Sequence, residues 1–205
     1  MMIGELFVAT ASKIMPDASR VQSLWAEIEK QYSHRSRRYH TLRHLEKMTA
    51  ELEGVKEQIE DFEAIVFAIV YHDVVYKATK KDNEEKSAEL ARKRLTSLSY
   101  SSQAVERVAG HILATKSHHK SADNDTNLFT DADLSVLGAP WEAYQEYYQQ
   151  IRKEYAIYPH LLYKPGRRKV LQHFLDLPAI FKTEAFHTRY EGQARENLFR
   201  ELEML

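Results

Sequence analysis

The stretch from Phe62 to Tyr76 is the most apolar part of this chain, and it constrains the fold more than any other segment. Apolar residues cover nearly all sides of the helix that it predicts, which is typical of a helix at the centre of a bundle. His72 and Asp73 fall near the C-terminal end of that helix. A carboxylate in apolar surroundings must be paired, change its pKa or bind a metal, and imidazole and carboxylate are both common metal ligands. This pair is therefore the first candidate for a functional site.

The remainder of the chain also favours helices, and we predict an all-α protein. Only six glycines and five prolines occur in 205 residues, and both residue types are the ones that disfavour helix interiors. Apolar residues recur at three- and four-residue spacing from Ala18 to Tyr32, after a cap at Asp17, and again from Thr41 to Val55. Further helices are predicted after Asp82 or Asn83, after Ser101 or Ser102, after Pro140, from Arg167 to Leu175 and from Tyr190 to Leu205, with a polar loop from about Lys116 to Asn127.

Composition excludes several classes of function. The absence of cysteine removes thiolate catalysis, disulfides and thiolate metal sites, so that any metal must bind nitrogen and oxygen ligands. A formal net charge of -1 argues against binding to duplex nucleic acid. The N-terminus reaches Glu5 without a basic region, and the apolar run is interrupted by Glu63 and Asp73 and is too short to span a bilayer. We therefore expect no signal peptide, no membrane partner and, by default, a cytoplasmic location.

Other imidazoles and carboxylates occur on both sides of the His-Asp pair. Upstream, His40 and His44 are four residues apart, so that on a helix both side chains point the same way. Downstream, His118 is followed by Asp131 and Asp133. The chain therefore offers the order histidine, His-Asp pair, aspartate.

This ordered series resembles the signature of the HD-domain superfamily, and in most detail a bacterial branch of predicted metal-dependent HD phosphohydrolases. That signature is a histidine, then an adjacent His-Asp pair, then a distant aspartate. The segments that carry the resemblance extend over nearly the whole chain and are Tyr39 to His44, Tyr71 to Tyr76, Asp82 to Ala88, Asp131 to Gly138, Ile151 to Tyr155, Gly166-Arg167 and Ala194 to Leu198.

The resemblance implies a fold and a set of ligands. It implies a compact HD-domain bundle over residues 1–205, with a metal-site core at about 30–140 and a C-terminal helical extension at about 140–205. It also implies that His44, His72, Asp73 and Asp133 bind the metal, and that His72 and Asp73 are the catalytic residues.

Two assignments have alternatives. Either His40 or His44 matches the first histidine of the signature. We take His44, because an inward-facing helix follows it directly, and His40 then supports the site or faces the substrate. Asp133 matches the terminal aspartate, whereas Asp131 is expected to cap a short helix that begins near Ala132.

Further residues are secondary candidates. His118 follows a predicted helix, in a region where two-metal members of the family carry extra histidines, but a solvent-exposed loop histidine is an equal alternative. Glu84 is either a general base or a structural ion-pair partner, while Glu191 and Arg195 are expected to pair with each other along a helix. A phosphate group needs positive partners, and the candidates are Arg43, Lys77, Lys116, Arg152 and Arg167.

The function implied by the resemblance is hydrolysis of a phosphate ester, in a nucleotide or another small phosphorylated metabolite, by metal-activated water. Mn, Mg, Fe, Co, Ni and Zn all fit nitrogen and oxygen ligands to some degree, and one or two ions per chain are expected. Neither a phosphomonoesterase nor a phosphodiesterase is favoured. The alternative is a metal-containing nucleotide-binding or regulatory module without turnover, and a homo-oligomer is compatible with either.

Overall fold

The computed structural model describes residues 2–205, and within that range it contains ten α-helices, two short 3-10 helices and no strand. The all-α prediction is therefore confirmed. The chain divides into two compact units, of which unit 1 ends at Thr130 and unit 2 runs from Asp131 to Leu205. The division lies inside helix α7 (Asn124–Leu134), before the expected start of the extension at about residue 140. The single-domain organisation over residues 1–205 stays a prediction.

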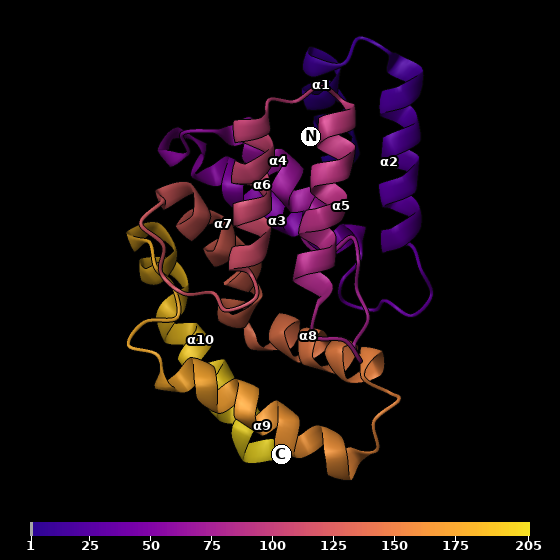
Figure 1. The fold of residues 1–205 in the computed structure, drawn as a ribbon. Helices are drawn as coiled ribbons and strands as arrows, with labels where there is room; N and C mark the ends of the chain where they lie inside the picture. The colour runs from indigo at the N-terminus through magenta and orange to yellow at the C-terminus, as the bar shows by residue number, and fades with distance from the viewer. Residues whose placement is uncertain (1) are drawn as a thin grey trace. The chain divides into compact units, whose positions relative to one another are not determined.

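Helix α4 (Phe62–Tyr71) is the centre of unit 1, as its apolar sequence predicts. Every residue from Ala64 to Tyr71 is buried. The helix is shorter than the apolar run, because it ends at Tyr71 with His72 as its C-cap. The helices that pack against α4 are α1 (Ile3–Ile14), α3 (Leu42–Gly54), α5 (Asn83–Ser97) and α6 (Ser102–Ala114) (Figure 1).

Two helix starts in unit 1 follow from local capping. Helix α2 (Ala18–Tyr32), which packs on α1, has the predicted bounds, and the side chain of Asp17 accepts a hydrogen bond from the backbone of Arg20 at 3.1 Å. Ser101 caps α6 in the same way, through the backbone of Ala104 at 3.2 Å. Such caps satisfy backbone donors that the first helical turn leaves open. Both signals are local, which is why the sequence predicts them.

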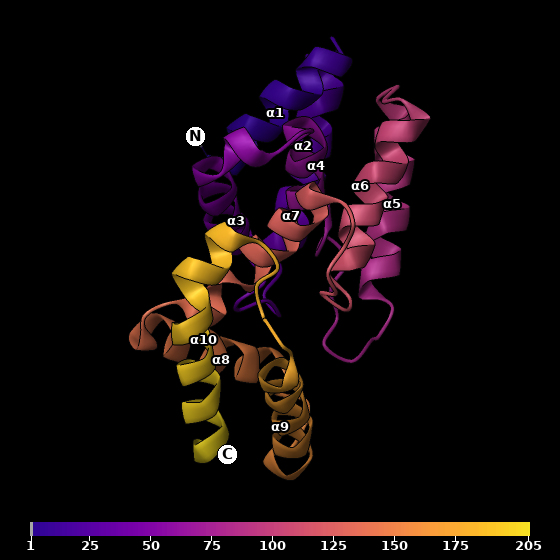
Figure 2. The ribbon, with the colours of Figure 1, turned by 90° about the vertical axis from the view of Figure 1, so that its left-hand side faces the viewer.

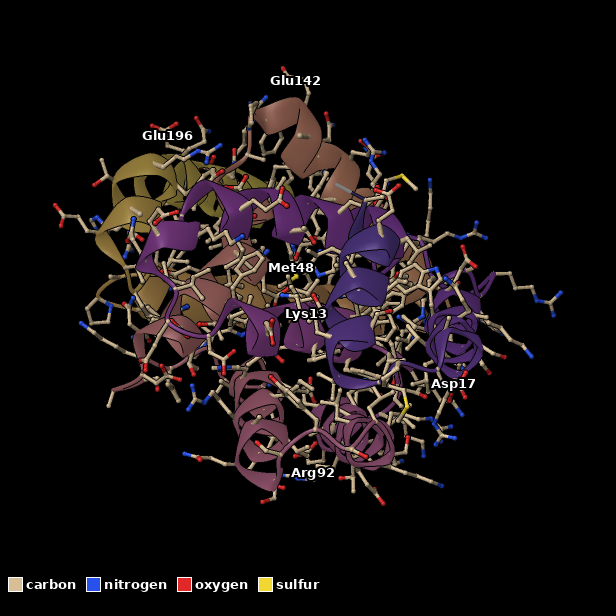
Figure 3. All side chains as sticks on the ribbon, turned by 90° about the horizontal axis from the view of Figure 1, so that it is seen from above. Lys13, Asp17, Met48, Arg92, Glu142 and Glu196 are labelled. Atoms are coloured by element: carbon tan, nitrogen blue, oxygen red, sulfur yellow. The ribbon has the colours of Figure 1, made fainter. Side chains whose placement is uncertain are left out.

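Apolar side chains lie between the packed helices, and charged side chains lie mainly on their outer faces. Met48 on α3 is 1% exposed and lies among the packed helices, whereas Asp17 and Arg92 project outward (Figure 3). No helix within residues 2–205 combines the length and the apolar character needed to cross a membrane.

The predicted polar loop is shorter than expected at its C-terminal end. The chain is irregular up to Asp123, and α7 begins at Asn124, so that the residues up to Asn127 are helical. The carboxylate of Asp123 accepts hydrogen bonds from the backbone of Asp125 at 3.1 Å and from the hydroxyl of Thr126 at 2.7 Å. This cap starts the helix within a segment whose composition is that of a loop.

Unit 2 is built from the end of α7, η2 (Ser135–Gly138), α8 (Trp141–Glu154), α9 (His160–Asp176) and α10 (Glu184–Met204). Helices α9 and α10 pack on each other (Figure 2), and α10 also packs on η2. The amide of Asn197 donates to the carbonyls of Leu137 and Ala139, both at 2.8 Å. Gly138 is required there, because a Cβ would lie 2.6 Å from the Cβ of Tyr190.

Two expected helix starts in unit 2 are wrong. Helix α9 begins at His160 rather than Arg167 and contains Pro165, whose missing donor costs one backbone hydrogen bond. Helix α10 begins at Glu184 rather than Tyr190. Contacts between distant segments decide the second start, since the backbone amide and hydroxyl of Thr183, the N-cap of α10, both donate to Asp131 at 2.8 Å.

Asp131 therefore does not have the expected role. It lies inside α7 instead of capping a helix near Ala132, and its carboxylate is fully buried. It accepts from the backbone of Lys182 at 3.0 Å and lies 2.9 Å from the ammonium of the same residue. The predicted pair of Glu191 and Arg195 is confirmed, at 2.8 Å.

Candidate metal centre

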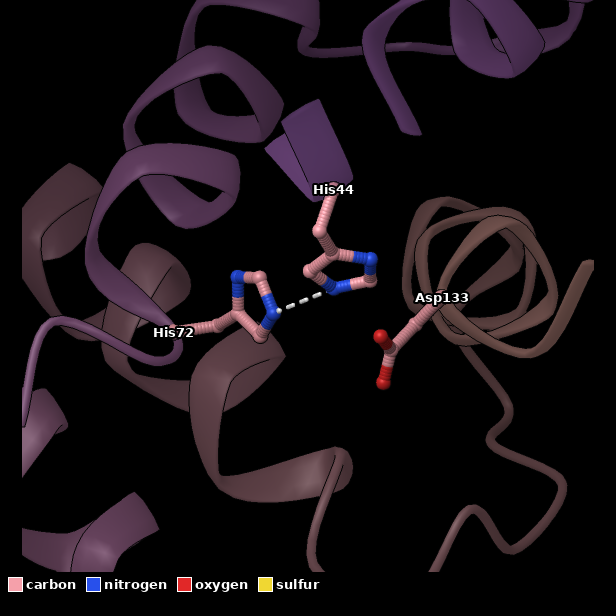
Figure 4. A group of neighbouring side chains, drawn as sticks. All are labelled: His44, His72 and Asp133. Carbon is pink, nitrogen blue, oxygen red and sulfur yellow. Dashed lines mark hydrogen bonds between the residues drawn. The ribbon is translucent and has the colours of Figure 1, made fainter. Parts of the chain in front are cut away.

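His44 and His72 meet at the centre of the site. His44 lies in the first turn of α3, and His72 is the residue that ends α4. Their Nε2 atoms are 3.3 Å apart, and the two residues are only 3% and 1% exposed (Figure 4). The predicted pairing of the upstream histidine with the His-Asp dipeptide therefore exists in the fold.

The tautomer of His72 follows from its backbone contact. Nδ1 of His72 lies 2.9 Å from the carbonyl oxygen of Ile69. A carbonyl oxygen only accepts, so Nδ1 must carry a proton, and in the neutral ring Nε2 then presents a lone pair. Such a contact is the usual way in which a protein orients a metal-ligating imidazole. The lone pair of His72 is directed to the side on which His44 lies.

Two carboxylates complete the candidate ligand set. An oxygen of Asp73 lies 3.1 Å from Nε2 of His72. Asp133, in the last turn of α7, offers one oxygen that lies within 4.8 Å of a ring nitrogen of His44 and of His72 (Figure 4). Two imidazole nitrogens and carboxylate oxygens at such separations fit a divalent ion of borderline hardness, such as Zn, Fe, Co, Ni or Mn. His44, His72 and Asp133 therefore form one group of ligand atoms, and Asp73 lies beside it next to His72.

His40 lies beside the group without belonging to it. Its Nε2 atom is 3.8 Å from the carboxylate of Asp73, and its side chain is 17% exposed. Its ring packs on that of Tyr76, with centroids 4.2 Å apart. Of the two histidines in the segment, His44 is the one that meets His72, which favours it as the ligand and leaves His40 as the neighbour of Asp73.

Arg37 is a residue of the site that the sequence does not reveal. Its guanidinium donates to the carbonyls of Asp73 at 2.7 Å, His40 at 3.2 Å and Val74 at 2.9 Å. The residue is 6% exposed, and its guanidinium lies over the ring of Tyr32, 4.7 Å from the centroid. Arg37 therefore fixes the two backbone segments that carry His40 and Asp73. In the sequence it is one arginine among several, and nothing marks it as buried.

Two side chains of α5 hold the loop that follows α4. The hydroxyl of Ser87 accepts from the backbone of Val75 at 3.1 Å, and the amide of Asn83 bonds both backbone groups of Lys77 at 3.1 Å. These contacts give the segment from Asp82 to Ala88 a role in positioning the chain after His72. Asn83 thus serves the loop, while Asp82 is the N-cap residue of α5.

Three of the predicted phosphate-binding residues have internal partners. Lys116 is ion-paired with Glu85. Arg152 donates to the carbonyls of Tyr155 and Tyr158, at 2.9 and 3.0 Å. Arg167 is 7% exposed and makes a bidentate pair with Glu201, with both hydrogen bonds 2.8 Å long. These side chains stabilise the fold where they lie, and we do not include them among the proposed substrate contacts.

The two remaining secondary candidates lie outside the ligand group. His118 is half-buried in the loop after α6 and has a positive φ of 52°, a conformation uncommon for a residue with a side chain. Glu84 is half-buried in the first turn of α5. Neither residue is part of the group of ligand atoms formed by His44, His72 and Asp133.

His111 on α6 is a buried histidine that sequence reasoning missed. Thr126 donates its hydroxyl proton to Asp123 at 2.7 Å, so Nδ1 of His111, which lies 2.8 Å from that hydroxyl oxygen, is the donor in their contact. Burial lowers the pKa of His111 below its ordinary value of 6.5. Its neutral form is therefore the one that the fold favours.

Comparison with models of protein families, with curated proteins and with solved structures finds no match to this chain. The chemistry of the site is consequently argued from its own residues.

Proposed function

We propose that this protein is a metal-dependent phosphohydrolase of the HD-domain type, acting on a nucleotide or another small phosphate ester. The observation that carries the proposal is the convergence of His44, His72 and Asp133 on ligand atoms within 4.8 Å of one another. Asp73 adds a carboxylate oxygen 3.1 Å from His72. The set contains the residue types, in the order along the chain, that the family signature requires.

The protonation of His72 supports a cation at this position. Its Nε2 lone pair lies 3.1 Å from a carboxylate oxygen of Asp73 and 3.3 Å from Nε2 of His44. Without an ion, Nε2 of His44 is the donor in its hydrogen bond to this lone pair. A divalent ion would take the place of that proton, because neutral imidazole and carboxylate are both metal ligands. One ion or two, of Mn, Mg, Fe, Co, Ni or Zn, would satisfy these ligands.

A divalent ion held there would lower the pKa of a water molecule toward neutrality and polarise a phosphoryl oxygen. The chain's own residues supply the remaining tasks. Asp73 is 16% exposed at its side chain, so one carboxylate reaches solvent and can orient the attacking water. His40, 3.8 Å from that carboxylate, is placed to take up or release a proton next to Asp73. The cytoplasmic location and homo-oligomerisation stay predictions.

The test is phosphate release by metal-stripped protein that is re-supplied with Mn, Mg, Fe, Co, Ni or Zn. The substrates are a panel of nucleotides and small phosphate esters, and metal content is measured in parallel. Asp73→Ala is the variant, and Asp176→Ala is its control, because Asp176 is an exposed carboxylate on α9.

We expect turnover that requires a metal, is lost in Asp73→Ala and is kept in Asp176→Ala. Metal-dependent turnover in Asp73→Ala would refute the assignment of Asp73. Metal loading with nucleotide binding but no product would instead support the regulatory module.

A further inference from the structure

Unit 1 contains a pocket of about 390 Å³ where the end of α2 leads into α3. Four of its lining residues are arginines, Arg35, Arg37, Arg38 and Arg43, and we call it the arginine pocket. The segment from residue 32 to residue 43 contains these four arginines, two histidines and no acidic residue, whereas the whole chain has a formal charge of -1. The positive charge is therefore concentrated at one hollow of the surface.

Hydrogen bonds order the wall of the arginine pocket at Arg37 and at His34. Arg37 is 6% exposed, and its guanidinium is bonded to three backbone carbonyls, among them those of His40 and Asp73. At the exposed surface of the same segment, Nδ1 of His34 lies 2.8 Å from the hydroxyl of Ser36. A pocket whose wall is already ordered loses little entropy when a ligand binds.

Arg35 supplies a charge that has no structural task. It is exposed, and within residues 2–205 the structure assigns it neither a hydrogen bond nor an ion pair. The first turn of α3 adds to the positive potential, since Leu42 lines the pocket, Thr41 makes no side-chain cap, and no acidic residue occurs in that turn. Guanidinium groups and an open helix N-terminus both favour phosphate oxygens.

Arg37 also connects the arginine pocket to the candidate metal centre. It lines the pocket, and it bonds the carbonyl of Asp73 at 2.7 Å. The pocket lining includes none of His44, His72 and Asp73. Arg37 is therefore shared by the wall of the pocket and by the backbone that carries Asp73, and this shared residue is the observation that relates the two sites.

We propose that the arginine pocket binds the non-reacting phosphate groups of the substrate, so that the substrate is a small molecule with two or more phosphates in a row. A nucleoside di- or triphosphate belongs to this class, and so does an inorganic oligophosphate. This proposal rests on the proposed phosphohydrolase function only in calling the ligand a substrate. Binding of phosphate groups to the pocket does not depend on turnover.

Binding is tested on the metal-stripped full-length chain by titration calorimetry with phosphate, pyrophosphate, tripolyphosphate and a nucleoside triphosphate. The variant is Arg35→Glu, and the control is Arg168→Glu, since Arg168 is an exposed arginine on α9 of unit 2. We expect tripolyphosphate to bind about tenfold or more tightly than phosphate, and Arg35→Glu to lose about tenfold in affinity. Arg168→Glu should bind as the unchanged protein does.

Equal affinity for phosphate and tripolyphosphate would overturn the proposal, and so would equal binding by the two variants. Tighter binding of the nucleoside triphosphate than of tripolyphosphate would identify a nucleotide, and equal binding an inorganic oligophosphate. Tighter binding of a short single-stranded RNA than of either would overturn a small-molecule ligand. Circular dichroism checks that both variants fold.

Turnover separates this proposal from the function on which it rests. In the metal-loaded enzyme, Arg35→Glu should reduce kcat/KM about tenfold for a di- or triphosphate and leave an aryl monophosphate unaffected. An equal effect on both substrates would overturn the role of the pocket while the phosphohydrolase stands. No turnover of either substrate, with oligophosphate binding kept, would overturn the hydrolase and leave the pocket.

Discussion

In unit 2, the carboxylate of Glu201 accepts hydrogen bonds from Arg167 at 2.8 Å and from the hydroxyl of Tyr144 at 2.5 Å. In unit 1, the carboxylate of Asp73 lies 3.1 Å from Nε2 of His72. In the neutral ring, the proton of His72 is on the other nitrogen, Nδ1, which contacts the carbonyl oxygen of Ile69. The first carboxylate is surrounded by donors. The second lies beside an imidazole nitrogen that can bind a metal.

This difference shows how a buried charge is to be interpreted. Unit 2 contains three buried carboxylates, those of Asp131, Glu191 and Glu201, and each accepts hydrogen bonds from groups of the same unit. A buried charge that is fully hydrogen-bonded belongs to the fold. Burial of a charged group is therefore a weak indication of function, and convergence of several potential metal ligands is a stronger one.

Asp131 and Asp133, two carboxylates on helix α7, test this comparison most directly. The largest change in activity is expected for Asp133. We expect Asp133→Asn to lose metal binding and to reduce metal-dependent turnover about a thousandfold, because a lost metal interaction of several kcal/mol has that effect on a rate. Metal content and kcat/KM are the measurements. An Asp133→Asn protein that retains both would show that this carboxylate is not a ligand.

Asp131→Asn, two residues earlier on α7, should do the opposite. It leaves the buried ammonium of Lys182 unpaired, so we expect the free energy of unfolding to fall by about 3–5 kcal/mol. Metal binding by the folded fraction should be unchanged. Urea denaturation followed by circular dichroism, with metal titration below the transition, measures the two effects. Loss of metal without loss of stability would contradict the structural role of Asp131.

Metal should stabilise the protein through the candidate ligands His44, His72 and Asp133. At a free metal concentration about a hundred times the Kd, binding to the folded state alone adds about 2.7 kcal/mol to the free energy of unfolding. We expect a chelator to remove this gain in the unchanged protein, and Asp133→Asn to show no gain at all. Thermal melting with and without metal checks this, and equal shifts in both proteins would place the metal elsewhere.

The smallest effect is a pH dependence from His111. Burial lowers its pKa below 6.5 in the folded state, so the unfolded chain takes up the proton first as the pH falls. Its contribution to stability is full above pH 6.5 and is lost as the pH falls from there toward the lowered pKa. His111→Gln should flatten this dependence, whereas His173→Gln, on an exposed residue of α9, should not. Unfolding free energies at about pH 7.5 and about pH 5.5 measure the slope, and equal slopes in the two variants would contradict the assignment.

The parts of the fold that the sequence predicts are those that local chemistry decides. The bounds of α2, its cap at Asp17 and the cap at Ser101 depend on neighbouring residues alone. The central position of α4 depends on its composition. By contrast, the start of α10 at Glu184 and the place of Asp131 within α7 depend on contacts between segments far apart along the chain. Periodicity contains no information on such contacts.

The candidate site divides in the same way. The resemblance to the HD-domain signature implies His44, His72, Asp73 and Asp133 as ligands. In the structure, His44, His72 and Asp133 offer ligand atoms within 4.8 Å of one another, and Asp73 lies 3.1 Å from His72. Arg37 could not be found, because an arginine that bonds backbone carbonyls has the same sequence pattern as one in solvent. Its role appears only when the carbonyls of His40 and Asp73 are placed around it.

By itself, the sequence determined an all-α protein with a buried central helix and nitrogen and oxygen as the only metal ligands. These follow from side-chain chemistry and from periodicity, which are properties of short stretches. Only the tertiary structure decided which buried charges are saturated, which nitrogen of His72 carries its proton, and which arginine is fixed beneath the site. Each of these depends on a hydrogen bond between atoms whose closeness the folded backbone alone determines.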